Sequence, residues 1–230
     1  MELEKVTRKS GARGGKRYHD ACGAAHGLDL LGERWAMLVV RELCFGPRRF
    51  GDLKGDLCGI SANVLTQRLE GLEAAGVLHR RKLPPPASVQ VYELTDWGYE
   101  AAPIFQVLGR WAARSPSHDP TLPLSAVSAM MSMQTMIDME RAGGFTARMG
   151  FVLAGQSFVA WIAGGVLNVR RVDAPEGEAI IEGRPEALAG WLYGKPPLAA
   201  MEASGDLTVR GDRALAETWQ TFFDLPPKAA

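Results

Sequence analysis

Three leucines set the strongest limit on how this chain can fold. Leu65, Leu69 and Leu72 recur at helical spacing after Ser61, a good N-terminal cap, and Gly76 is placed to end the helix. A shorter apolar pattern precedes them, and a three-residue turn containing glycine separates the two patterns. Two short helices joined by such a turn make a helix-turn-helix. The sequence therefore predicts this motif in its first half.

The segments around the motif predict its winged form. Residues 33–43 have the apolar spacing of a preceding core helix. Residues 77–83 and 88–94 are strand-like and are joined through three prolines, which favours a β-hairpin wing. A single helix predicted over residues 95–113 has more apolar positions than a lone small domain needs. We expect this helix to take part in a homodimer.

Composition narrows the class of protein without defining it. The chain has 230 residues, 47% of them hydrophobic, which is enough for two separate cores. Lys and Arg total 26, as do Asp and Glu, so the net charge does not indicate DNA binding and only local clusters of basic residues can.

Three cysteines and no visible signal peptide favour a reducing cytoplasm. Residues 149–169 are uncharged, but their glycines favour two β-hairpins over a membrane span.

We predict an α+β chain with two folded domains. Residues 1–17 are basic and lack apolar periodicity, which is typical of a disordered tail. Residues 18–114 form the winged helix-turn-helix and dimerisation domain. Residues 115–123 contain three prolines and are expected to form a linker, and residues 124–225 are expected to form an α+β domain with an antiparallel sheet and a ligand site.

Several short motifs in the first half resemble the HxlR family of winged-helix regulators. They include LLGERW at 30–35, GPRRFGDL at 46–53, LTQRLEGLEAAGV at 65–77 and YELTDWG at 92–98. The motifs occur in the right order over less than half of the chain. The resemblance implies a homodimer that binds double-stranded DNA at a roughly palindromic operator.

The second half is similar to sterol-carrier-protein-2-like domains. A Met-rich helix over 125–142 precedes a β-meander, two short helices, the motif GDLTVRGD at 205–212 and a closing helix. Such domains enclose an apolar tunnel, so the resemblance implies a lipid-like effector. The residues expected to line the pocket are Met133, Met136, Phe151, Trp161, Trp191, Trp219 and Phe222. An ordinary packed core explains the same residues equally well.

The candidate DNA contacts follow from the leucine pattern. With the leucines buried, the polar side chains near the start of the second helix point outward, where they can read base edges. Arginines and a lysine in the wing and before the first helix of the motif are placed to contact phosphates. Strand alternation sends Arg80 and Arg81 to opposite faces. The full set is Arg48, Arg49, Ser61, Asn63, Thr66, Gln67, Arg68, Arg80, Arg81 and Lys82.

Other chemistry has weaker support. Cys22 is a redox candidate because cysteine recurs at its position in HxlR-like proteins. His19, Cys22 and His26 could share a helix face, but a fourth ligand is not evident, so no metal is predicted. No nucleophile–base motif or phosphate loop is present, and we expect neither an enzyme nor a cofactor. The alternatives to a ligand-controlled regulator are a thiol-based redox sensor and a lipid or acyl-chain carrier with a dimerising winged helix.

Overall fold

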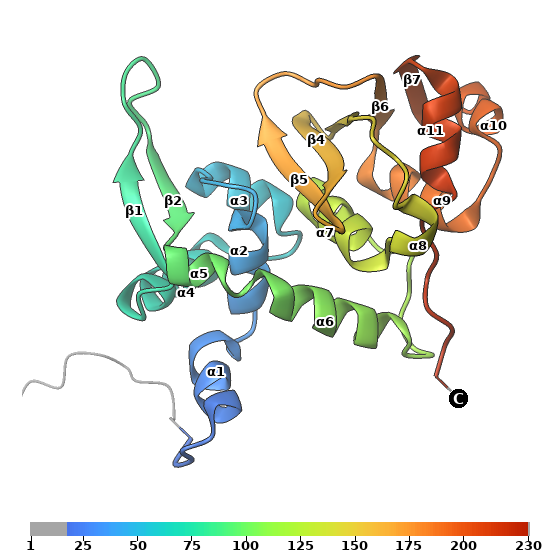
Figure 1. Ribbon diagram of the computed structural model, residues 1–230. Helices are drawn as coiled ribbons and strands as arrows, with labels where there is room; N and C mark the ends of the chain where they lie inside the picture. Colours follow the sequence, from blue (N-terminus) through green and yellow to red (C-terminus); the bar gives the residue numbers. More distant parts are fainter. Residues whose placement is uncertain (1–17, 230) are drawn as a thin grey trace, which may run out of the picture.

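The computed structural model describes residues 18–229, and the tail predicted at residues 1–17 lies outside them. The chain forms two parts that lie side by side (Figure 1). Helix α6 (Ala102–Ala113) extends beneath them and leads from the first part to the second. No helix within residues 18–229 is long and apolar enough to cross a membrane.

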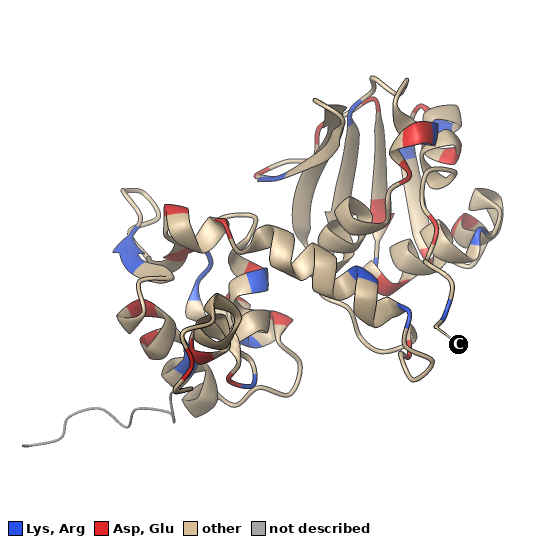
Figure 2. Cartoon of the chain, turned by 60° about the horizontal axis from the view of Figure 1, so that its bottom comes forward, with Lys and Arg blue, Asp and Glu red and all other residues tan. Residues whose placement is uncertain are grey.

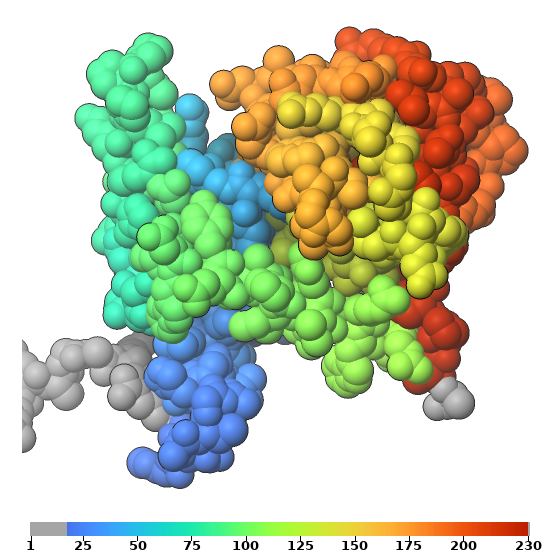
Figure 3. All heavy atoms as spheres, viewed as in Figure 1, coloured from blue at the N-terminus to red at the C-terminus, as the bar shows by residue number. Residues whose placement is uncertain are grey.

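The first part has a helical core and a β-hairpin. Its helices are α1 (Gly23–Leu31), α2 (Ala36–Leu43), α3 (Phe50–Asp56) and α4 (Ala62–Ala74). Strand β1 (Leu78–Lys82) pairs in antiparallel fashion with β2 (Gln90–Leu94), and this hairpin extends away from the body (Figure 3). The predicted winged helix-turn-helix is confirmed.

Helix α4 has the cap and the buried face that its sequence predicts. The Ser61 Oγ accepts a hydrogen bond from the Val64 N–H at 3.3 Å. Leu65, Leu69 and Leu72 are each no more than 1% exposed. Full burial of a leucine side chain contributes about 1.5–3 kcal/mol, so this face holds α4 against α2 and β1.

Two predicted helix boundaries in the first part are wrong. Helix α2 begins at Ala36, because Trp35 has φ +79°, a left-handed conformation that cannot continue a right-handed helix. The single helix predicted over 95–113 is two helices, α5 (Asp96–Tyr99) and α6. Thr95 caps α5, and Pro103 lies in the first turn of α6, where its missing N–H costs nothing.

The second part is a five-stranded sheet with helices. Its strands are β3 (Met149–Leu153), β4 (Gln156–Ala163), β5 (Val166–Val172), β6 (Ala179–Gly183) and β7 (Leu207–Gly211), in the order β5-β4-β3-β6-β7. Its helices are α7 (Ala126–Met136), α8 (Met139–Ala142), α9 (Pro185–Gly194), α10 (Leu198–Ala203) and α11 (Arg213–Gln220). The segment considered as a membrane span thus forms β3, β4 and most of β5.

The predicted antiparallel sheet is wrong in one pairing, because β6 lies parallel to β3 and the sheet is mixed. Residues 173–178 cross from the edge strand β5 to the far side of β3, so β6 enters in the direction of β3. Gly177 permits the crossing, since a Cβ there would lie 2.6 Å from the carbonyl oxygen of Arg148. The Met-rich helix predicted over 125–142 is also interrupted, at Ile137, which is extended and forms a β-bridge with Phe223.

The second core lies between the sheet and its helices. Helix α7 contacts β5 and α9, and α11 contacts β6 and β7. The core is aromatic and Met-rich: Trp219 packs 6.2 Å from Phe151 between ring centroids, and Met130 and Met133 are fully buried.

Candidate nucleic-acid interface and the junction between the two parts

The outward face of α4 presents a compact set of polar side chains. Asn63, Thr66 and Gln67 are exposed, while the leucines on the opposite side are buried. Ser61 is also exposed at the start of the helix, but its hydroxyl already accepts the capping hydrogen bond from Val64. Three exposed polar side chains near a helix N-terminus have the geometry needed to read base edges in a major groove.

Two of the candidate arginines are held by internal ion pairs. Arg68 lies 3.2 Å from the Glu33 carboxylate (Nη2 to Oε2) and is half-buried. Arg48 pairs with Asp56, and its side chain is only 11% exposed. Arg48 also exchanges backbone hydrogen bonds with Tyr92 of β2, so it connects the wing to α3. Both arginines therefore stabilise the packing of the first part through internal ion pairs.

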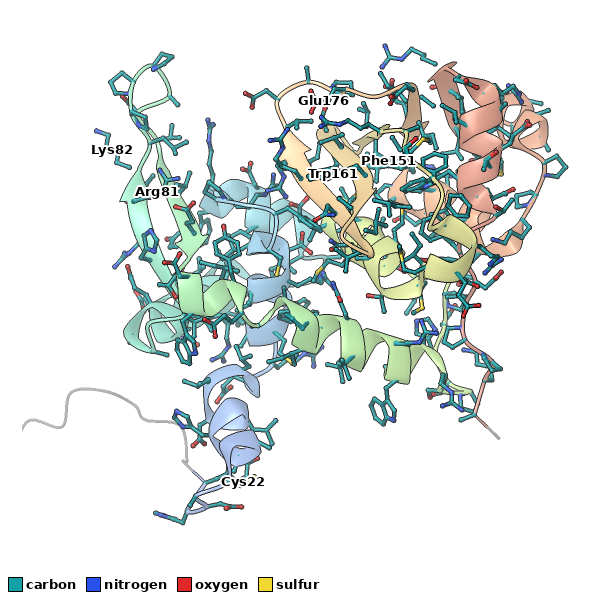
Figure 4. The ribbon with its side chains drawn as sticks, in the orientation of Figure 1. Cys22, Arg81, Lys82, Phe151, Trp161 and Glu176 are labelled. Atoms are coloured by element: carbon teal, nitrogen blue, oxygen red, sulfur yellow. The ribbon has the colours of Figure 1, made fainter. Side chains whose placement is uncertain are left out.

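The wing separates its basic residues as strand alternation predicts. Arg80 turns toward α4 and pairs with Glu73 at 2.8 Å, which holds the pKa of that carboxyl below its usual range. Arg81 turns to the other face and pairs with Glu93. Lys82 and Arg49 are exposed and make no ion pair with any residue in 18–229. Basic residues gather on β1, and Arg81 and Lys82 lie together there (Figures 2 and 4).

The three thiols occupy different environments. Cys22 is exposed at the start of α1, at the end of the first part away from the wing (Figure 4). The backbone N–H groups of Ala24 and Ala25 lower its pKa. Burial raises the pKa of Cys44 to about 12, so that thiol stays protonated. Within residues 18–229, no group of three His, Cys, Asp or Glu side chains is arranged to hold a metal ion.

Six of the seven candidate pocket residues come together, and they do so as packed core. Met133, Met136, Phe151, Trp191, Trp219 and Phe222 are each no more than 6% exposed and, Met136 apart, belong to one cluster. Trp161 is separate, because it lies on the other face of the sheet and stacks with Arg148 at 5.9 Å. The indole N–H groups of Trp191 and Trp219 have no acceptor within residues 18–229.

A polar junction between the two parts was missed by the sequence reasoning. Arg171 of β5 donates one hydrogen bond to the Phe45 carbonyl at 3.2 Å and one to Gln156 at 3.1 Å. Gln156 in turn donates to Asp56 of α3 at 3.2 Å. Arg171 also stacks on Phe158 at 5.4 Å. The only sequence signal was an arginine at an inward-facing strand position, which suggests a buried partner without naming it.

A second contact at the junction buries a carboxyl group. Glu42 of α2 is fully buried, and its Oε1 accepts hydrogen bonds from Ser125 (2.7 Å) and Arg41 (2.7 Å). Its Oε2 has no partner in the described chain. Burial raises the pKa of Glu42, and the nearby Arg41 charge opposes this only in part. The junction thus ties α2, and α3 of the helix-turn-helix, to the second part.

Known proteins resemble the first part of the chain. The HxlR-like helix-turn-helix family matches residues 30–119. YvaP of Bacillus subtilis, an uncharacterized HTH-type transcriptional regulator, is 38% identical over 85 residues, which are 37% of this chain and 79% of YvaP. YodB, an HTH-type transcriptional regulator of the same organism, is 35% identical over 85 residues, 37% of this chain and 76% of YodB. The structure of reduced YodB aligns with a TM-score of 0.39 at 31% identity, covering 43% of this chain and 98% of YodB.

The capped α4 with its polar face and the basic wing define a winged helix-turn-helix transcriptional regulator. The relatives that match the first part by sequence are transcriptional regulators and not enzymes. The chain belongs to the HxlR-like helix-turn-helix family and is a DNA-binding regulator of that type.

Proposed function

We propose that the protein binds a roughly palindromic operator as a homodimer, with α4 in the major groove and the wing on the phosphate backbone. The observation that carries this proposal is the exposed polar face of α4 formed by Asn63, Thr66 and Gln67. Lys82 and Arg49 support it, because neither is held by an ion pair within the described chain. Base-reading and phosphate-contacting side chains then lie on adjoining elements.

The DNA contacts are tested by measuring affinity for the intergenic DNA beside its own gene across a salt series. Gln67→Ala should weaken specific binding by about 1–3 kcal/mol and relax the preference at one base pair. Lys82→Ala should weaken binding to all sequences alike and reduce the salt slope by about one unit. Glu217→Ala, an exposed substitution on α11, is the control. Binding no tighter than to random DNA would refute the proposal and favour the carrier alternative.

The homodimer is proposed from an uncovered apolar face on α6. Ile104, Val107, Leu108 and Trp111 recur at helical spacing and are 41–72% exposed. Four large apolar side chains on one exposed helix face favour contact with a second copy of the chain. In a symmetric dimer, the α6 faces of the two copies would pack together and both would be removed from water. Trp111→Glu should give monomers of 24.9 kDa by light scattering, whereas Leu122→Glu, an exposed position outside this face, should not. A monomeric unmutated protein would refute the dimer.

A small-molecule effector controlling DNA binding is part of the same proposal. The sequence-based pocket among the core aromatics stays a prediction, since a ligand there has to displace packed side chains. The two buried indole N–H groups that have no acceptor in the described part of the chain are the features that favour it. Native mass spectrometry of the purified protein tests for a bound lipid, and a spectrum with only the unliganded chain would contradict it.

Thiol sensing is a second candidate function, favoured by the exposure and lowered pKa of Cys22. Thiolate is the reactive form, so Cys22 should react with peroxide faster than Cys58, which is exposed as well. Under this reading, oxidation changes DNA affinity in the unmutated protein and in Cys58→Ser, but not in Cys22→Ser. An equal response of all three proteins would rule it out.

A further inference from the structure

A cleft lies between the two parts, next to the helix-turn-helix. Its cavity volume is about 530 Å³. One wall comes from α2 and from residues 55–58, which end α3 and begin the turn toward α4. The other wall comes from the N-terminal ends of α7 and α9 and from Ala154 in the β3–β4 turn. Pockets of about 300–1,000 Å³ take small organic molecules.

Most of the cleft lining is apolar. Trp35 and Leu38 contribute from the start of α2, Leu57 from the end of α3, and Leu124 from the segment before α7. Trp35 and Leu38 are partly exposed, so part of their apolar surface is not covered by the core and faces the cleft. A planar or alicyclic hydrocarbon body would cover this surface and contribute about 25 cal/mol for each Å² removed from water.

One end of the cleft is polar and rich in donors. Arg41, Ser125 and Ser128 line it, and Glu42 lies behind them. Arg41 uses Nε and Nη2 on Glu42, while its Nη1 donates to no other described residue. The buried Glu42 Oε2 lacks a partner in the described chain. Burial raises the pKa of Glu42, so this carboxyl opposes a nearby anion less than an exposed glutamate would.

The other carboxylates at the cleft already have donors. Asp56 accepts from Arg48 and Gln156, and the Glu186 Oε1 accepts from the Leu124 N–H at 2.8 Å. Arg184 at the rim pairs with Asp206 at 3.0 Å. Among the described residues, the donor left free at the polar end is thus Nη1 of Arg41. A ligand carboxylate in the cleft would accept from Arg41, whereas Glu42 is fully buried behind the lining residues and positions Arg41.

We propose that this junction cleft is the effector site, and that it takes a small aromatic or alicyclic carboxylate whose charged group lies against Arg41. The inference rests on the proposed function as far as control of DNA binding is concerned. A ligand held here contacts the end of α3 and the second part together, so it biases the position of the helix-turn-helix relative to the second part. That differential contact is the physical requirement for coupling.

The test uses the full chain and 2-naphthoate. The uncharged control ligand is 2-naphthalenemethanol, which has the same naphthalene ring system without the carboxylate. Isothermal titration calorimetry without DNA should show one saturable site for 2-naphthoate and at least about tenfold weaker binding of the alcohol. Arg41→Met should weaken naphthoate binding by about tenfold. Cys58→Trp, an exposed position in the wall, should block the cleft even if Arg41→Met fails to fold. Arg34→Met is the matched control, because Arg34 stacks on Trp35 at 5.7 Å but does not line the cleft.

The outcomes separate the site from the function. Absence of a saturable naphthoate site, unchanged binding in Cys58→Trp, or equal binding of the alcohol would overturn the site. Saturating naphthoate should also shift operator affinity by about fivefold or more, and it should do so less in Arg41→Met. Ligand binding without that shift would overturn the effector role. If the protein binds no specific DNA, the proposed function is refuted. The calorimetry still shows whether the cleft binds naphthoate.

Discussion

Replacement of Arg171 by methionine tests whether the polar junction holds the two parts together. Methionine keeps most of the side-chain volume over Phe158 but removes the hydrogen bonds to the Phe45 carbonyl (3.2 Å) and to Gln156 (3.1 Å). Hydrogen bonds from a charged donor contribute about 1.5–3 kcal/mol each, and their loss leaves two half-buried acceptors without this donor.

Two costs of the native arrangement reduce this loss. Burial, and then the nearby charge of Arg48, lower the pKa of Arg171 to about 10, which means that the charged form is held at some expense. Its Nε is also buried without a partner. We therefore expect Arg171→Met to lower the free energy of unfolding by about 2–4 kcal/mol, less than the two hydrogen bonds would give if summed.

The neighbouring Arg170 provides a matched control on the same strand. It points to the opposite face, its side chain is 62% exposed, and it pairs with Glu176 at 3.2 Å. Exposed ion pairs contribute about 0–1 kcal/mol, so Arg170→Met should change stability little. Urea unfolding at neutral pH measures both variants. If Arg171→Met lies within about 0.5 kcal/mol of Arg170→Met, the reasoning about the junction is wrong.

Three further predictions concern the first part. The pKa of Glu42 is raised in the folded protein, so the stability that Glu42 contributes is present below its usual pKa of 4.5 and is lost as the pH rises through the raised pKa. Glu42→Gln should therefore flatten the loss of thermal stability between pH 5 and 8. A variant with the pH profile of the unmutated protein would contradict this prediction. Leu69→Ala should cost about 2–5 kcal/mol in urea unfolding through the cavity it leaves, and a cost below about 1 kcal/mol would mean that α4 is not packed as described. Ser61→Ala should cost about 0.5–2 kcal/mol, and rescue by Ser61→Asp would identify the cap as the cause.

The first part was predictable because its signals are local. The Ser61 cap and the spacing of the three leucines lie within one helix, and the alternation of side chains along a strand is enough to place Arg80 and Arg81 on opposite faces. The break between α5 and α6 was missed although Pro103 marks it, because the surrounding apolar spacing suggested one continuous helix. Propensity and spacing determine where helices form, and a proline at a boundary decides where they end.

The second part and the junction depended on contacts between distant residues. The parallel pairing of β6 with β3 is set by the path of residues 173–178, which no local pattern encodes. The roles of Arg48 and Arg68 were missed for the same reason, since their partners Asp56 and Glu33 lie on other elements. The sequence alone does not distinguish an arginine that faces DNA from one that pairs with a carboxylate inside the protein.

The hydrogen-bonded junction limits how freely the two parts can be exchanged between proteins. A chimera that fuses residues 124–229 to another winged helix through the segment 115–123 keeps the covalent connection. It keeps the orientation of the two parts only if the recipient supplies a carboxyl group opposite Ser125, as Glu42 does, and another opposite Gln156, as Asp56 does. The relative orientation of the two parts is therefore specified by side chains on both of them, and a graft without these residues would give two parts joined only by the linker.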